Sequence, residues 1–252
     1  MPIPYLRSLT ALERSSRANV QLACYLTFTA GAVNAGGFLA VHYYTSHMSG
    51  IVSAMADHLV LGGVAVVAQG LAALLAFVAG AACCALLVGF GRRARLRSGY
   101  ALPLLVEAAL LLAFGVLGAN LGEHRWLSVS ITVMLLCFIM GLQNAMIGAV
   151  SGSQIRTTHI TGMVTDAGME LGKLCYWNIR PLADPGLHVR ADRQRLRLLC
   201  VLIGLFFLGG VIGAYCFQRF GFVATLPLAA GLFVLAVVPV ADDLRAGWRP
   251  RP

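Results

Sequence analysis

Long apolar runs alternate with short polar segments along the whole chain. Six runs reach roughly the 20 residues that an α-helix needs to cross a bilayer. They cover residues 19–41, 63–90, 101–120, 127–150, 198–218 and 222–241. Because a segment inside lipid must satisfy its own backbone hydrogen bonds, each run is expected to be a helix. The pattern predicts an all-α fold, a polytopic membrane protein with about six transmembrane helices.

Two shorter segments of mixed polarity interrupt this pattern, one in each half of the chain. They are IVSAMADHLVLGG at 51–63 and MVTDAGMELGKLCYW at 163–177. A helix of roughly 12 to 15 residues, rising 1.5 Å per residue, is too short to cross the hydrocarbon core. Each segment is expected to be either a re-entrant half-helix or an interfacial amphipathic helix.

Each short segment follows a polar hexamer, and the two hexamers are nearly the same. TSHMSG lies at 45–50 and TTHITG at 157–162. Each trails a related element, GAVNA at 31–35 and GLQNA at 141–145. With the N-terminus inside, the first run leads outward and the fourth leads inward, so the two copies have opposite orientations. The duplication predicts a 3+3 inverted-topology repeat, the construction of many secondary transporters.

This repeat divides the chain into two units with polar ends and one main cytoplasmic loop. The expected parts are a tail at 1–18, a first repeat at 19–120, a second repeat at 127–241, a loop at 178–197 within it, and a tail at 242–252.

Composition and charge agree with a membrane protein. Only 12% of the residues are charged, against about 25% in a soluble domain. The net charge of +9 follows topology, because all of the 19 Lys and Arg residues except Arg125 and Arg219 would lie on the inner side. This bias predicts that both termini are cytoplasmic. The basic loops are expected to attract anionic lipid, and a nucleic-acid role is excluded because no aromatic residues interleave with them.

The N-terminus and the cysteines add two further expectations. The first 18 residues are polar and basic, and the first apolar run is too long for a cleaved signal peptide. The seven cysteines lie mostly inside apolar runs and form no CxxC pair, which favours small packing residues over a disulfide framework or a zinc site. No cofactor is expected.

The hexamers and their preceding elements hold the candidate substrate-binding residues. Hydroxyl groups there can cap a helix start, the glycines permit a close approach of the backbone, and histidine can donate, accept or carry a proton. The candidates are Asn34, Thr45, Ser46, His47, Ser49, Gly50, Gln143, Asn144, Thr157, Thr158, His159, Thr161 and Gly162. Alternatively, the hexamers are ordinary surface loops with capping hydroxyls. Two copies at symmetric places favour a buried functional role.

Acidic residues supply candidates for coupling a proton or an ion. Glu107 lies near the middle of an apolar run, where an ionisable side chain is expensive and is a functional candidate by default. The alternative is a neutral Glu107 bonded to a neighbouring helix, or one that snorkels to the inner face. Asp166 and Glu170 are four apart and share a helix face, so with His159 they form either a cation or proton site or the wetted face of an interfacial helix.

Polar and small residues within the runs also suggest contacts between helices. Gln143 and Asn144 are amides inside a span that need partners, so they either belong to the site or simply join helices. Gly209 and Gly213 form a GxxxG element, which indicates close helix packing or a homodimer contact.

The paired motifs resemble those of the YoaK-like family of bacterial inner-membrane proteins, a family of unknown function. The matching residues are GAVNA with HMSG, and GLQNA with RTTHITG, and the resemblance covers about residues 20–240. It implies a multi-pass protein of the bacterial inner membrane and names no substrate. The chain departs from the family pattern at Asn34, where many members have Asp, and at Ile51, where many have Asn.

The leading functional hypothesis is a permease for a small molecule or an ion. Its two hexamers would meet near the midplane, and a helix start there favours a small anionic or zwitterionic solute. One alternative is an intramembrane enzyme, metal-dependent or not, although the sequence contains no HExxH or GxSxG element. The other is a membrane scaffold or sensor, although the chain has no sizeable soluble domain.

Overall fold

The structure is a computed structural model that describes residues 16–94, 96, 99–119, 125–151, 160–176 and 189–245. Over these ranges the regular elements are α-helices and one short 3-10 helix, with no β-strand. The elements are α2 (Ser16–Val41), α3 (Met48–Val60), α4 (Val64–Arg93), α5 (Ala101–Ala119), α6 (Arg125–Ser151), α7 (Ile160–Cys175), α8 (Arg193–Phe220), η2 (Gly221–Ala224) and α9 (Thr225–Arg245). The all-helical prediction is confirmed, and the element ends lie within a few residues of the predicted ones.

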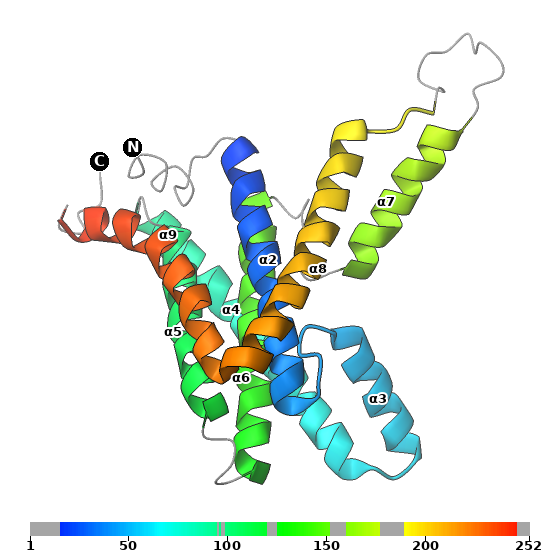
Figure 1. Ribbon diagram of the computed structural model, residues 1–252, viewed down its shortest axis with the longest axis vertical. Coiled ribbons are helices and arrows are strands. Elements are labelled where there is room, and N and C mark those ends of the chain that lie inside the picture. Colours follow the sequence, from blue (N-terminus) through cyan, green and yellow to red (C-terminus); the bar gives the residue numbers. More distant parts are fainter. Residues whose placement is uncertain are drawn as a thin grey trace.

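Five helical stretches are long and apolar enough to cross a membrane. They are Arg17–Val41, Val64–Arg93, Ala101–Ala119, Val129–Ala149 and Arg193–Arg245. The last stretch has 53 residues and contains α8, η2 and α9. Gly221, at a φ of 61° that an L side chain rarely adopts, ends α8. Figure 1 shows the chain reversing there, so that α9 runs back toward the end at which α8 began.

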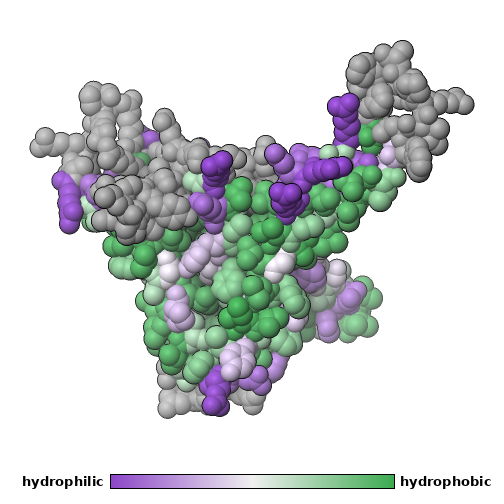
Figure 2. Space-filling model, turned by 45° about the horizontal axis from the view of Figure 1, so that its top comes forward, coloured by the Kyte–Doolittle hydropathy of each residue, from purple (hydrophilic) through white to green (hydrophobic). Residues whose placement is uncertain are grey.

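The surface has the distribution of polarity that a bilayer requires. Figure 2 shows a broad zone of hydrophobic side chains across the middle of the molecule and hydrophilic ones along its upper edge. The start of α2, the start of α8 and the end of α9 all lie at that upper end (Figure 1). The chain is therefore a helical, multi-pass membrane protein.

The core is formed by apolar side chains from helices of both halves of the chain. Leu26 on α2, Leu104 on α5, Leu136 on α6 and Leu232 on α9 are each fully buried or nearly so. Helices α2 and α8 pack along each other, as do α4 and α6 and also α5 and α9.

Helices α2 and α8 approach each other through two glycines in a reciprocal arrangement. A Cβ added to Gly31 would collide with the backbone oxygen of Phe206, and one added to Gly209 would collide with the backbone oxygen of Phe28. Each helix therefore contributes a Phe-x-x-Gly element whose glycine lies against the phenylalanine backbone of the other.

The same arrangement joins α4 and α6. A Cβ on Gly80 would collide with the backbone oxygen of Phe138, and one on Gly141 would collide with that of Phe77. The four elements read FTAG, FVAG, FIMG and FFLG along the chain. Because a glycine lets two helix backbones touch, these four elements place both helix pairs in close contact.

The GxxxG element of α8 is used inside the chain. Gly209 faces Phe28 and Gly213 faces Ala32, both on α2. These glycines are therefore buried against α2 and do not form a contact between two copies. Of the two interpretations of this motif, close helix packing holds and the homodimer contact is wrong. The homodimer itself stays a prediction without their support.

The short helices α3 and α7 lie on the same side of the molecule and run in opposite directions. With 13 and 16 residues they measure about 20 and 24 Å at 1.5 Å per residue, less than the hydrocarbon core. Figure 1 shows α3 running from mid-height toward the lower end, and α7 running from mid-height toward the upper end. Helix α3 packs on α4, and α7 packs on α8.

Candidate functional site

The first hexamer follows a tight turn that folds back over the end of α2. His42 has a φ of 54°, which turns the chain away from the helix axis, and its N–H donates to Phe38 O at 2.8 Å. The Phe38 ring stacks on Tyr44, with centroids 4.5 Å apart and planes inclined by 15°. The His47 N–H donates to Tyr44 O at 3.2 Å, which completes the turn.

A side-chain hydrogen bond fixes how far the hexamer returns along α2. Ser46 Oγ donates to Asn34 Oδ1 at 2.8 Å. Asn34 precedes the last residue of α2, Val41, by two helical turns, which is about 10 Å. The segment that leads into α3 is therefore held about two turns back from the end of α2, against a helix long enough to cross the membrane.

The hydroxyl groups do not cap α3, contrary to the prediction. The N-cap residue is His47, and no side chain supplies a cap hydrogen bond. Ser46 is bonded to Asn34 instead, Ser49 is exposed, and Thr45 is fully buried. The Thr45 hydroxyl has no hydrogen-bond partner within the described ranges.

Gly50 makes room for the imidazole of His47. A Cβ on Gly50 would collide with Cδ2 of His47 and would also crowd Nε2. His47 itself is exposed, so the ring lies over the first turn of α3 and remains accessible. The glycine of the hexamer thus determines where its histidine lies.

The second hexamer is described only from its fourth residue onward. Thr157, Thr158 and His159 lie outside the described residues, so the predicted meeting of His47 and His159 stays a prediction. Helix α7 begins at Ile160, with Thr161 exposed and Gly162 half-buried. Since α3 begins at Met48, both short helices start at the fourth position of their hexamers.

The two amides of GLQNA lie in different surroundings. Asn144 is half-buried, whereas Gln143 is fully buried. Gln143 Nε2 donates to Glu107 Oε1 at 2.9 Å and to Leu26 O at 3.3 Å. Gln143 therefore joins α6 to α5 and α2, and both of its amide hydrogens are used in the core.

Glu107 does not snorkel to the inner face. Its side chain is fully buried, and Gln143 is its hydrogen-bonding partner. The sequence singled out Glu107 and Gln143 separately and did not pair them. Both residues are polar, lie inside different spans and need a hydrogen-bonding partner. This shared need was the signal from which the pair could have been predicted.

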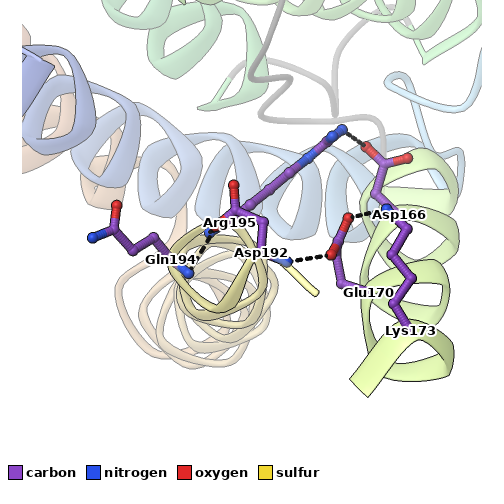
Figure 3. Close-up of polar contacts among 6 residues, drawn as sticks. All are labelled: Asp166, Glu170, Lys173, Asp192, Gln194 and Arg195. Atoms are coloured by element: carbon purple, nitrogen blue, oxygen red, sulfur yellow. Dashed lines mark hydrogen bonds and ion pairs between the residues drawn. The ribbon is translucent and has the colours of Figure 1, made fainter. Parts of the chain in front are cut away.

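Asp166 and Glu170 join α7 to the start of α8 (Figure 3). Arg195 Nη2 donates to Asp166 Oδ2 at 2.9 Å, and Lys173 Nζ donates to Glu170 Oε1 at 2.7 Å. The backbone N–H of Asp192 donates to Glu170 Oε2 at 2.7 Å. Both carboxylates already have partners, so the structure shows a contact between helices where a cation site was one of two expectations. Coupling through Asp166 stays a prediction.

The charge on Glu170 is stabilised by these contacts. The hydrogen bond from the Lys173 ammonium and the backbone N–H of Asp192 hold the pKa of the Glu170 carboxyl below its usual range, with a smaller contribution from the charge of Arg195.

Comparison with known proteins gives a family and no relative of known activity. The model of a family described as "Protein of unknown function (DUF1275)" matches residues 22–238, most of the chain. The chain belongs to the DUF1275 family. Neither the curated proteins nor the solved structures contain a match. The resemblance to the YoaK-like family stays a prediction, because no named relative tests it.

The sequence missed how α8 of this DUF1275 protein begins. Residues 193–197 were expected to belong to the cytoplasmic loop, but α8 starts at Arg193. Asp192 caps the helix, because its side chain accepts hydrogen bonds from the backbone N–H groups of Gln194 and Arg195. An aspartate directly before a helix is a recognised start signal, and it could have been found from the sequence.

The described residues offer this DUF1275 protein no evident metal centre. They contain no group of three or more His, Cys, Asp or Glu side chains that could hold an ion together. The candidate site stays the one predicted from the sequence, the two helix starts and the polar residues around them.

Proposed function

We propose that this DUF1275 protein is a permease for a small anionic or zwitterionic solute. It would lie in the bacterial inner membrane, as in the YoaK-like proteins that it resembles, with both termini in the cytoplasm. Its six membrane-length helices, α2, α4, α5, α6, α8 and α9, would form two inverted repeats of three. The hexamers at the starts of α3 and α7 would form the substrate site.

The reciprocal glycine contacts support the inverted repeat. Exchanging α2 with α6 and α4 with α8 converts the contact of Gly31 with Phe206 into the contact of Gly141 with Phe77. It also converts the contact of Gly209 with Phe28 into that of Gly80 with Phe138. Helix α3 on α4 is likewise exchanged with α7 on α8. A pseudo-two-fold axis in the membrane plane would produce this exchange.

The return of the first hexamer along α2 is the observation that carries the proposal. The bond from Ser46 to Asn34 holds the start of α3 about 10 Å back along α2 from its last residue. The helix start then presents free backbone N–H groups and a partial positive charge away from bulk water. Such a place favours a negatively charged group, as at the broken helices of known transporter folds.

The proposed site combines the polar groups near the two helix starts. From the first half it takes Asn34, Thr45, Ser46, His47, Ser49 and Gly50, and from the second half Asn144, Thr157, Thr158, His159, Thr161 and Gly162. Gln143 is left out, because its amide hydrogens are bound to Glu107 and Leu26.

Solute uptake by proteoliposomes tests the proposal. The purified chain is reconstituted and offered a panel of labelled small anions, amino acids and neutral sugars. We expect uptake of an anion or an amino acid, and at least a tenfold loss in His47→Ala and in His159→Ala. His58→Ala is the matched control, because His58 lies near the opposite end of α3 and should leave uptake unchanged.

Two outcomes would contradict the proposal in different ways. If no solute of the panel enters above empty liposomes, the protein is not a permease for these classes. If a solute enters but both histidine variants match the parent, the site has been assigned to the wrong residues. Within the described ranges, no observation favours the intramembrane enzyme or the scaffold.

A further inference from the structure

A buried carboxyl group lies inside the helix bundle. Glu107 is the seventh residue of α5, which has 19 residues, and its side chain is fully buried. The side chain is therefore not in reach of water by snorkelling. An ionisable group in this position needs either a partner of opposite charge or a proton.

The amide of Gln143 fixes the geometry of this carboxyl group. Gln143 Nε2 donates one hydrogen to Glu107 Oε1, at 2.9 Å, and the other to Leu26 O, at 3.3 Å. If the Nε2 and Oε1 atoms of Gln143 were exchanged, Gln143 Oε1 would face two acceptors, Glu107 Oε1 and Leu26 O. The contacts therefore determine which end of the amide faces Glu107.

Two oxygens are left over by this arrangement, one on each side chain. Glu107 Oε2 and Gln143 Oε1 are both buried, and neither has a donor among the described residues. The titratable groups near enough for the charge of Glu107 to act on them include Tyr25 on α2 and Cys84 on α4, and neither is a cation. An ionised Glu107 would therefore be a buried charge with a single hydrogen bond, which is strongly unfavourable.

We infer that Glu107 is a proton-binding site, with the proton on Oε2 and shared with Oε1 of Gln143. The acid and the amide then form two parallel hydrogen bonds, since Gln143 Nε2 already donates to Glu107 Oε1. One proton gives a partner to both unsatisfied oxygens and removes the buried charge. The proton binds from water and returns to water, so no other reactant is required.

A proton fits this site better than a metal ion does. Calcium and magnesium take six or more oxygen ligands, whereas the pair offers two free oxygens. Glu107 also belongs to no group of metal-binding side chains in the described part of the chain.

The site lies where the two halves of the chain meet. The pair and Leu26 connect α5 and α2 of the first half to α6 of the second. When the proton leaves, Glu107 becomes an anion beside the Oε1 of Gln143, and the connection between the halves is weakened. The proton is therefore the ion that couples to movement of one half against the other. This coupling rests on the proposed permease function, whereas proton binding itself does not.

Infrared spectroscopy of the whole protein in lipid vesicles tests the inference. At neutral pH we expect a carbonyl band of a protonated carboxylic acid that Glu107→Gln lacks. In Gln143→Leu the same band is expected at higher frequency, because Glu107 Oε1 has lost its donor. Glu107→Gln keeps the size and the neutrality of the protonated side chain and can donate to Gln143 Oε1, so it should fold. Protein labelled with carboxyl-13C glutamate identifies the band without any substitution.

The outcomes separate this inference from the permease proposal. Identical spectra of the parent and Glu107→Gln in the protonated-carboxyl region would overturn the inference, as would the absence of an isotope-shifted band. If the band is present but no solute is transported, the proton site stands and the permease fails. If solute is transported but a pH gradient does not drive it in the parent, the coupling is wrong and the proton site stands.

Discussion

The glycines of the four Phe-x-x-Gly elements bring the backbone of one helix directly against the backbone of another. A Cβ at Gly141 would meet Phe77 O, and one at Gly209 would meet Phe28 O. Backbone atoms have no freedom to rotate away, so the helices themselves would have to move apart. A side chain at these positions is therefore expected to push the two helices apart.

Gly141→Ala and Gly209→Ala are expected to destabilise the protein by about 1–3 kcal/mol each, the usual cost of overpacking. The measurement is the midpoint of thermal unfolding in detergent, which should fall by a few degrees for each kcal/mol. Gly148→Ala on α6 and Gly204→Ala on α8 are the matched controls, because no atom lies within 4 Å of a Cβ added there. Equal midpoints in all four variants would show that the close approach is wrong.

Gly50 has a different role, because its neighbour can move. In Gly50→Ala the new methyl group would displace the His47 ring, which is exposed and free to rotate. We expect an unfolding midpoint close to that of the parent, together with a loss of solute uptake similar to that of His47→Ala. Gly172→Ala on α7, where a Cβ meets no atom within 4 Å, should change neither. Normal uptake in Gly50→Ala would show that the position of His47 does not matter.

At the scale of elements, α7 is attached to the bundle mainly through α8. The attachment includes the ion pair of Asp166 with Arg195 and the contacts of Glu170 with Lys173 and the Asp192 N–H. The pKa of Glu170 is lowered in the folded protein by its hydrogen bonds from Lys173 and Asp192. Its contribution is therefore complete above the pKa of the unfolded chain and is lost as the pH falls through the folded value.

We expect α7 to stay attached at neutral pH and to loosen only when the pH falls below the usual pKa range of a glutamate, because the pKa of Glu170 is lowered in the folded protein. A spin label introduced by Gly172→Cys, in a background without the native cysteines, reports this as increased mobility. Glu170→Gln should raise the mobility already at neutral pH and reduce the change on acidification. An unchanged acid response in Glu170→Gln would assign the attachment to the other contacts.

The elements could be predicted from the sequence because apolar run length alone determines where a helix can cross lipid. The ends of α4 and α5 were predicted closely for this reason. The capping of α3 was wrong because Ser46 uses its hydroxyl to reach Asn34, a residue on another element. The pairing of Glu107 with Gln143 was missed for the same reason, since a contact between helices depends on how they pack and leaves no spacing to read.

At the scale of the whole molecule, the four Phe-x-x-Gly elements can be found in the sequence, but the helices that they join cannot be predicted from it. The four elements are visible in the sequence, yet phenylalanine and glycine are common in membrane helices and the pattern alone is weak. The structure shows what the pattern is for, because Gly31 packs against Phe206 and Gly141 packs against Phe77. The hexamers predicted the duplication, and the packing of α2 on α8 and of α4 on α6 supplies the independent support.

An inverted repeat makes a prediction about the two faces of the membrane. Ser49 and Thr161 occupy the second position of α3 and α7, and both are exposed. If the repeats are inverted, Val60→Cys, at the far end of α3, should react with a membrane-impermeant thiol reagent added outside. Gly172→Cys, near the far end of α7, should react with the same reagent added at the cytoplasmic face. Ser49→Cys and Thr161→Cys should react more slowly than these two, because the helix starts lie deeper than the helix ends. Reaction of Val60→Cys and Gly172→Cys from one and the same face would exclude the inverted arrangement, and with it a substrate site formed by the two hexamers.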